Sequence, residues 1–181
     1  GGFCSGVVVS EDGVVFTNHH CGFSSIQQHS SVEHDYLKDG FVARSLEEEL
    51  PNPELYVRFL LRTENVTKRV LSAAKHAKTE SERRVAVDSV MNVIGMEVSE
   101  KDSTLTGIVD AYYAGNEFWL SVYRDYNDVR LVFAPPSSVG KFGWDTDNWM
   151  WPRHTGDFSM FRIYADKDGN PAEYSADNVP L

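Results

Sequence analysis

The stretch Thr17-Asn18-His19-His20-Cys21 decides how the start of the chain folds, because it joins groups that can transfer protons to a cysteine that can form a covalent link. Ahead of it, residues 7–16 form two β-rich runs separated by Asp12-Gly13, a dipeptide typical of tight hairpin turns. The pattern therefore predicts a β-hairpin. Folding at its turn would bring Cys4 towards Cys21.

A disulfide between Cys4 and Cys21 would close this hairpin and fix the backbone that carries His20. In the chain-entropy model, a loop of this size contributes about 3 kcal/mol. The alternative is a pair of free buried thiols, since unpaired cysteine commonly packs as a small apolar residue. A bridge would indicate an oxidising compartment, such as a bacterial periplasm or the cell exterior.

Composition limits the class of protein. The 181 residues are 41% hydrophobic and 12% aromatic, which predicts one buried core and a single domain or part of one. A formal net charge of −10 disfavours nucleic acid as a partner, because phosphates would be repelled. No apolar run approaches the roughly 20 residues of a membrane span. No signal-peptide pattern is present, but the sequence opens inside what looks like a structural element, so a removed upstream segment stays compatible with it.

The middle of the chain carries a helical segment between strands. Residues 22–50 indicate short helical pieces, with Ser30 or Ser31 as caps and a turn at Asp39-Gly40. Residues 55–62 then alternate as a strand. The apolar side chains of that strand, which should enter the core, are Leu55, Val57, Phe59 and Leu61.

Residues 64–102 show apolar side chains at helical spacing, which predicts two helices separated near Ala77-Lys78. Thr79 and Glu82 form the capping-box signature of the second helix. Strands over residues 105–114, 117–123 and 128–133 follow, and the turns between them predict an antiparallel meander. The fold class is therefore mainly β, with a helical insertion at about residues 64–102.

The second informative stretch is Asn148-Trp149-Met150-Trp151-Pro152-Arg153-His154-Thr155-Gly156-Asp157-Phe158, in which a carboxylate follows a glycine and begins a strand. By local sequence alone, Asp157 could simply cap the turn after Gly156. Trp144 and Trp151 are interpreted as packing residues, because large aromatic side chains generally bury surface. Arg153 and His154 could orient Asp157 or cover the loop.

The order Cys-Ser-Gly, apolar hairpin, His-Cys resembles the start of the chymotrypsin-like serine proteases, in which the catalytic base directly precedes a cysteine bonded back across the hairpin. The resemblance implies that His20 is the base and that His19 has a packing or hydrogen-bonding role. It also implies that Asp157 is the acid, which would accept a hydrogen bond from the imidazole Nδ1–H and stabilise the imidazolium.

A narrower resemblance covers essentially the whole chain. The His-His-Cys-Gly motif, the long motif at residues 148–158 and the long separation of His20 from Asp157 together resemble the bacterial serine dipeptidyl-peptidases of the dipeptidyl-peptidase 7 and 11 type. That separation is too long for an ordinary trypsin-like barrel, so inserted helices are required. The fold implied is a chymotrypsin-like antiparallel β-barrel, the first barrel of a double-barrel serine protease, with a large helical domain inserted later in the polypeptide.

The resemblance also implies an activity: removal of dipeptides from peptides with a free N-terminus, by a homodimer secreted to the periplasm or cell surface, without a cofactor. The residues matching Asn148 and Trp149 would hold the substrate's α-amino group together with an acidic residue from a later part of the protein. The chemistry is suitable, because the Asn148 amide oxygen can accept from an ammonium group and Trp149 offers a cation–π surface.

The nucleophile is missing. A chymotrypsin-type site needs a Gly-x-Ser-Gly-like loop for its serine and oxyanion hole, and Ser5-Gly6 and Ser24-Ser25 lack that context. The resemblance places the serine beyond residue 181, in the remainder of the same polypeptide. We therefore expect an amino-terminal fragment that carries base and acid but does not turn over substrate by itself. The residue that selects acidic or hydrophobic side chains is expected in the missing part too.

Two other classes of function stay open. A metal-binding module could use His19, His20, Cys21 and His154, but adjacent ligands chelate awkwardly and the usual zinc spacings are lacking. A non-catalytic peptide-binding protein with a protease-like fold is disfavoured by the presence of both His20 and Asp157.

Overall fold

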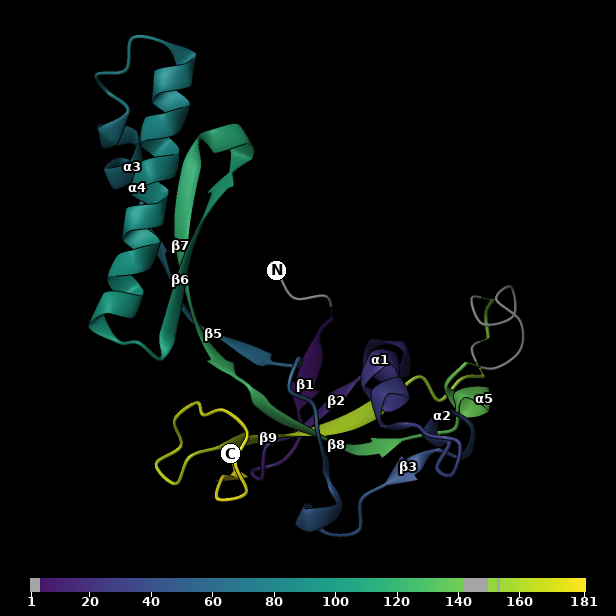
Figure 1. The fold of residues 1–181 in the computed structure, drawn as a ribbon. Helices are drawn as coiled ribbons and strands as arrows, with labels where there is room; N and C mark the ends of the chain where they lie inside the picture. The colour runs from purple at the N-terminus through teal and green to yellow at the C-terminus, as the bar shows by residue number, and fades with distance from the viewer. Residues whose placement is uncertain (1–3, 142–149, 153) are drawn as a thin grey trace. The chain divides into compact units, whose positions relative to one another are not determined.

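The computed structural model describes residues 4–141, 150–152 and 154–181, and the chain divides into two compact units (Figure 1). The first unit comprises Gly1–Val57 and Tyr126–Leu181, and the second comprises Arg58–Asp125. The chain therefore leaves the first unit once and returns to it once. Each unit has its own sheet and its own core.

The first unit is built on one antiparallel sheet. Its strands are β1 (Gly6–Val8), β2 (Val14–Thr17), β3 (Phe41–Val42), β4 (Leu50–Pro51), β8 (Asp128–Ala134), β9 (Ser159–Ala165) and β10 (Val179–Pro180). The paired strands follow the order β1-β2-β9-β8-β3, with β10 on β9 and β4 on β8. Its helices are α1 (His19–His29), α2 (Tyr36–Asp39), the 3-10 turn η1 (Leu46–Glu48) and α5 (Ser137–Gly140).

The core of the first unit lies between α1 and the central strands β8 and β9. Ile26 of α1 is fully buried and packs with Leu131 of β8 and Phe161 of β9. Burying each such side chain contributes about 1.5–3 kcal/mol. This burial fixes α1, and hence its first turn, against the sheet.

Charged side chains of the first unit are buried in pairs. Glu49 accepts hydrogen bonds from Arg162 Nε at 2.9 Å and from the Tyr164 hydroxyl at 2.8 Å. Arg130 forms a double hydrogen bond with Asp128, at 2.9 and 2.8 Å, and its guanidinium lies 3.6 Å from the centre of the Tyr164 ring. Each buried charge is thus compensated, as burial requires.

The second unit packs helices on a three-stranded sheet. Its strands are β5 (Val57–Asn65), β6 (Leu105–Tyr112) and β7 (Glu117–Tyr126), in the order β5-β7-β6, and its helices are α3 (Thr67–Ala73), α4 (Glu80–Lys101) and the 3-10 turn η2 (Tyr113–Gly115). In Figure 1, α4 runs alongside β6 and β7. The buried residues of this core are Val70, Ile94, Val98, Val109, Phe118, Leu120 and Val122.

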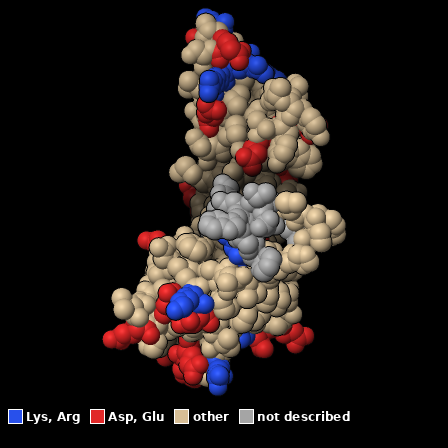
Figure 2. Space-filling view, turned by 90° about the vertical axis from the view of Figure 1, so that its right-hand side faces the viewer, with Lys and Arg blue, Asp and Glu red and all other residues tan. Residues whose placement is uncertain are grey.

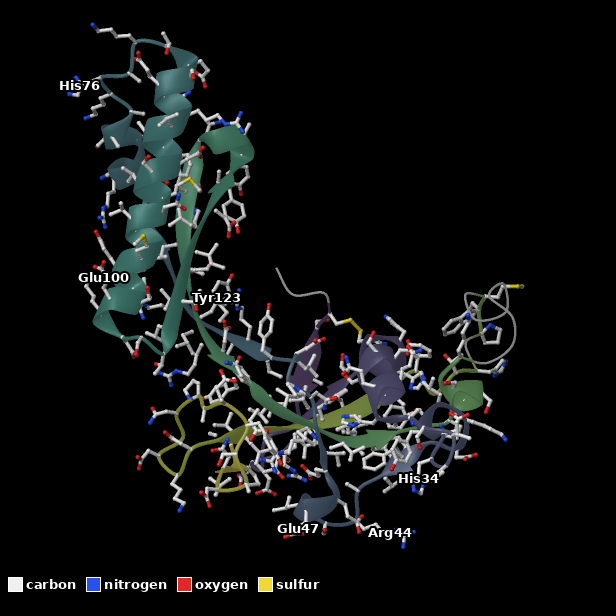
Figure 3. All side chains as sticks on the ribbon, viewed as in Figure 1. His34, Arg44, Glu47, His76, Glu100 and Tyr123 are labelled. Carbon is white, nitrogen blue, oxygen red and sulfur yellow. A yellow bond between two sulfur atoms is a disulfide. The ribbon has the colours of Figure 1, made fainter. Side chains whose placement is uncertain are left out.

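Arg58 and Asp125 tie together the two ends of the second unit. Arg58 Nε and Nη2 donate to the two carboxylate oxygens of Asp125 at 2.6 and 2.5 Å. The guanidinium also lies 5.1 Å from the ring centre of Tyr123, which is labelled on β7 in Figure 3. Entry and exit of the inserted segment therefore meet at one ion pair.

Several local predictions agree with this structure. Gly13 has φ of 70° in the turn between β1 and β2, and the two strands pair antiparallel as a hairpin. Glu82 N donates to Thr79 Oγ1 at 3.2 Å at the start of α4, while the Glu82 carboxylate accepts from Lys78 N at 2.8 Å. The fold is mainly β with helices inserted between strands, as the sequence predicts.

Other local predictions are wrong. The predicted meander ends at β7, because β8 pairs with β3, β4 and β9 in the other sheet. Leu61 is 47% exposed instead of buried, because the second unit, to which it belongs, has its core on side chains that do not include Leu61. Of the two predicted caps, Ser30 is the C-cap of α1, whereas the N-cap of α2 is Asp35.

The face drawn in Figure 2 carries charged side chains of both signs. Lys and Arg side chains gather at the upper end of this view, next to Asp and Glu, and Asp and Glu side chains predominate in its lower part. Among the described residues, no helix has both the length and the apolar character to cross a bilayer.

Candidate active site

The pairing of β2 with β9 brings the two motifs of the sequence together. Thr17, the last residue of β2, lies opposite Ser159, the first residue of β9. Continuing this antiparallel register by two residues places Asp157 beside the start of α1. Residues that are 137 positions apart in the chain thus become neighbours through one strand pair.

His20 occupies the first turn of α1, directly after the end of β2. The disulfide between Cys4 and Cys21, whose Cα atoms are 6.1 Å apart, ties this turn to the segment before β1 (Figure 3). The Thr17 hydroxyl adds a hydrogen bond to the Ser5 carbonyl at 2.9 Å. The backbone of His20 is therefore held from both sides.

Asp157 lies in the loop two residues before β9, which begins at Ser159 and not at Asp157 as predicted. His20 Nδ1 lies 3.0 Å from Asp157 Oδ2 and 3.3 Å from Oδ1. The main-chain N–H of His20 donates to Oδ1 at 3.2 Å. One residue thus contacts the carboxylate with both its ring and its backbone, which fixes the imidazole plane relative to the acid.

The electrostatics favour an ionised Asp157. Partial burial by itself raises the pKa of the carboxyl, but hydrogen bonds from the main chain and ring of His20, together with the one from Asn18, hold this pKa below its ordinary value. An ionised carboxylate can only accept hydrogen bonds, so Nδ1 of His20 carries the proton.

This tautomer leaves Nε2 of His20 with its lone pair, able to accept a proton. The His20 side chain is 65% exposed and the Asp157 side chain 26% exposed, so the imidazole is accessible while the acid is partly covered. The pair has the geometry of a general base with an orienting acid.

Asn18 is a third member of the cluster, which the sequence patterns did not indicate. Its side-chain Nδ2 lies 3.1 Å from Asp157 Oδ2 and 3.3 Å from the Asp157 carbonyl oxygen. The signal that could have located it is the strand register, which places residues 18–20 opposite residue 157.

His19 differs sharply from its neighbour. It is only 3% exposed, and neither ring nitrogen has a hydrogen-bond partner in the described part of the chain. Burial lowers the pKa of His19, the charge of Asp157 opposes this, and His20 adds to the lowering. Of the two roles predicted for His19, the structure places it in a packing role.

The His19 ring packs against α5. A Cβ on Gly140, the last residue of α5, would collide with that ring, so only glycine fits there. Next to it, Gly156 N donates to the Val139 carbonyl at 2.8 Å. His19, α5 and the residue before Asp157 therefore form one packed group behind the site.

The remaining predicted site residues have different outcomes. Asn148 and Trp149 lie outside the described residues. Trp151 is 87% exposed, against its predicted packing role. For the metal alternative, Cys21 has no thiolate to offer, since its sulfur is bonded to Cys4. The same bond disqualifies the close group of Cys4, His20 and Cys21 as ligands.

Comparison with known proteins adds the family. A model described as Peptidase S46 matches residues 1–181. The chain is 56% identical over 180 residues to dipeptidyl-peptidase 7 of Porphyromonas endodontalis, and the matched region makes up 99% of this chain and 22% of that protein. It is 52% identical over 180 residues to an Asp/Glu-specific dipeptidyl-peptidase of Capnocytophaga gingivalis, and here the matched region makes up 99% of this chain and 25% of that protein.

A solved structure is similar as well. The structure of Porphyromonas endodontalis DPP11 in complex with substrate matches with a TM-score of 0.88 and 49% identity, covering 98% of this chain and 27% of that one. The chain thus spans about a quarter of the length of these relatives. Since the family model matches every residue, the chain belongs to the peptidase S46 family.

Proposed function

We propose that this chain supplies the general base and the acid of a serine dipeptidyl-peptidase that releases dipeptides from the free amino termini of peptides. The observation that carries the proposal is the His20–Asp157 pair, with Nδ1 and Oδ2 3.0 Å apart, in a chain of the peptidase S46 family. Relatives that carry the name dipeptidyl-peptidase support the type of reaction.

In the proposed cycle, Nε2 of His20 accepts the proton of a serine hydroxyl as the serine attacks the scissile carbonyl. The resulting imidazolium, stabilised by Asp157, then donates that proton to the leaving amine. Water hydrolyses the acyl-enzyme with His20 again acting as base. The serine and its oxyanion hole belong, in this proposal, to a further part of a longer polypeptide, as the greater length of the relatives allows.

Specificity for a free amino terminus is proposed to come from Asn148 and Trp149. An amide oxygen can accept a hydrogen bond from the substrate's ammonium group, and an indole ring can contact the same charge through a cation–π interaction. An acidic residue elsewhere in the longer polypeptide would balance the charge. Both residues lie within the motif at 148–158, which leads to Asp157.

The wider setting is also part of the proposal. Residues 1–181 would form the amino-terminal part of the peptidase catalytic domain, contributing to the first of two β-barrels, with the helices between 64 and 102 as an insertion. We propose a homodimeric enzyme of the bacterial periplasm or cell surface. The Cys4–Cys21 bond supports an oxidising compartment, and two freely alkylated thiols in the native protein would remove that support.

The test uses the complete polypeptide and fluorogenic dipeptidyl substrates with a free amino terminus. We expect release of the dipeptide by the unaltered enzyme, its near abolition in His20→Ala, and a loss on the order of 10⁴ in kcat for Asp157→Asn, because the amide stabilises the wrong imidazole tautomer. His34→Ala is the control and should retain activity, because His34 is exposed and contacts Ser31 and Tyr36 instead of the His20–Asp157 pair.

Two further measurements separate parts of the proposal. Acetylation of the substrate's amino group should prevent cleavage, and equal cleavage of blocked and free peptides would show an endopeptidase instead. The isolated 181-residue chain should not turn over the substrate. Turnover by that chain, abolished in His20→Ala, would contradict the proposal that the nucleophile lies elsewhere.

A further inference from the structure

Asn18 occupies the N-cap position of α1 but does not cap the helix. Asparagine is favoured at N-caps because its side-chain oxygen accepts a hydrogen bond from an N–H of the first turn. Asn18 has the extended backbone of an N-cap, with φ of −69° and ψ of 148°, yet its side chain makes no capping hydrogen bond. The usual structural reason for this residue type therefore does not explain where its side chain lies.

The side chain of Asn18 turns instead towards Asp157. Nδ2 is 3.1 Å from Oδ2 of the carboxylate and 3.3 Å from the main-chain oxygen of the same residue. Both atoms are acceptors, so the amide must present its NH₂ group to them. This NH₂ group carries two protons, one for each contact.

Oδ2 of Asp157 is also the atom closest to the ring of His20, at 3.0 Å from Nδ1. Oδ1 accepts from the main-chain N–H of His20 at 3.2 Å. The carboxylate is thus held by three donors from two residues, two of them from His20 and one from Asn18. Asn18 fixes Oδ2 independently of the state of the imidazole.

We propose that Asn18 is a positioning residue, which holds Oδ2 of Asp157 against Nδ1 of His20. Its hydrogen bond also takes up part of the negative charge of Oδ2, and so limits how strongly Asp157 stabilises the protonated form of His20. This inference rests on the proposed function, since it concerns the same base and acid. A hydrogen bond to the carboxylate lowers the electron density available to Nδ1–H. Asn18 therefore acts on the proton affinity of His20 through Asp157.

The decisive variant is Asn18→Asp in the complete polypeptide. Aspartate has the same shape, is as good an N-cap and is favourable at a helix N-terminus, so the fold should be kept. It removes the NH₂ donor and places a second negative charge beside Asp157, which favours protonated His20. We expect the acidic limb of the pH profile of kcat/KM to move up by about one pH unit. At a fixed pH below the limb, kcat/KM should therefore fall about tenfold.

Gln28→Glu is the matched control. It adds the same charge to the exposed surface of the same helix, about 15 Å further along its axis than Asn18, where solvent and salt screen it. Its acidic limb should stay with that of the unaltered enzyme. Because the added charge alone favours protonated His20, the neutral Asn18→Ala, which only removes the NH₂ donor, must move the limb in the same direction by a smaller amount. A merely structural role of Asn18 would give Asn18→Ala a uniform loss of kcat/KM at every pH and a lower thermal midpoint, without a displaced limb.

A second measurement keeps this inference separate from the proposed function. Histidine-labelled protein can be titrated by NMR, with the His20 ring signal identified by its loss in His20→Gln. An upward displacement of that titration in Asn18→Asp supports the inference even if no dipeptide is released, an outcome that would overturn only the proposed function. An unmoved His20 titration in Asn18→Asp would overturn the inference, whatever the enzyme does.

Discussion

At the scale of single residues, the adjacent histidines His19 and His20 show how one helix turn creates two environments. The His20 side chain is 65% exposed and contacts Asp157, whereas His19 is 3% exposed and packs under Gly140. Successive helical residues point about 100° apart, so one can face the site while the next faces the core. The buried histidine should therefore affect stability, and the exposed one catalysis.

The buried His19 should make the folded protein less stable in acid. Burial is the main reason that its folded pKa lies below the ordinary 6.5, so the unfolded chain binds this proton first as the pH falls. The contribution to stability is complete above about pH 6.5 and is lost progressively as the pH falls towards the folded pKa. Asp157, whose pKa is below 3.8, titrates in a more acidic range and does not interfere.

The measurement is urea unfolding of the complete protein at a series of pH values between about 5 and 8. The unfolding free energy of the unaltered protein should decline below about pH 6.5, whereas His19→Gln, which cannot titrate, should start lower and decline less steeply. Parallel pH curves for the two proteins would show that His19 is not the group responsible.

What the sequence could predict of the site depends on how each contact arises. His20, Asp157 and the two cysteines were located from residue type and motif order, and the structure brings both pairs together. Asn18 could not be found in this way, because its bond to Asp157 is determined by the β2–β9 register and by an amide that leaves its usual capping role. Asn148 and Trp149 stay predictions.

At the scale of elements, the contact of α4 with β6 depends on two glycines. A Cβ on Gly95 would lie 2.6 Å from the carbonyl oxygen of Gly107, and one on Gly107 would lie 2.7 Å from the carbonyl oxygen of Gly95. Since backbone atoms are in the way, no side-chain rotation can relieve the clash. Helix and strand lie as close as they do because neither residue has a side chain.

Gly95→Ala is therefore expected to destabilise the second unit, although alanine is the better helix former by about 1 kcal/mol. Forcing α4 from β6 should cost about 1–3 kcal/mol, which outweighs that gain. Asn92→Ala, an exposed position one turn earlier on α4, is the control and should be neutral or slightly stabilising. Thermal unfolding of both variants checks the prediction, and a higher midpoint for Gly95→Ala would refute the close-contact argument.

Element types were more predictable than element partners. Helical spacing over residues 64–102 and the Thr79 capping signature locate α3 and α4, because both signals are local. The assignment of β8 to a meander failed, since its alternation is the same whether it pairs with β7 or with β9. The extent of the inserted unit, Arg58–Asp125, likewise follows from strand pairing that no local pattern records.

At the scale of the whole molecule, stability is divided between two cores. Val122 is fully buried in the core of the second unit, and Val129, only 1% exposed, lies in the core of the first. The residues of one core belong to Arg58–Asp125, and those of the other lie outside that range. Compact units with separate cores generally open as separate cooperative units.

Matched truncations of the two cores test this division in the complete protein. Val122→Ala should cost about 2 kcal/mol and raise hydrogen exchange roughly 30-fold within residues 58–125, while the exchange of residues 126–181 changes little. Val129→Ala should give the reverse pattern, with faster exchange around β8, β9 and α1. The His20–Asp157 pair lies in the first unit. Of the two variants, only Val129→Ala should therefore also change the NMR titration of the His20 ring. Equal acceleration of both segments by either variant would mean that the two cores unfold as one, and would remove the basis for treating Arg58–Asp125 as an independent insertion.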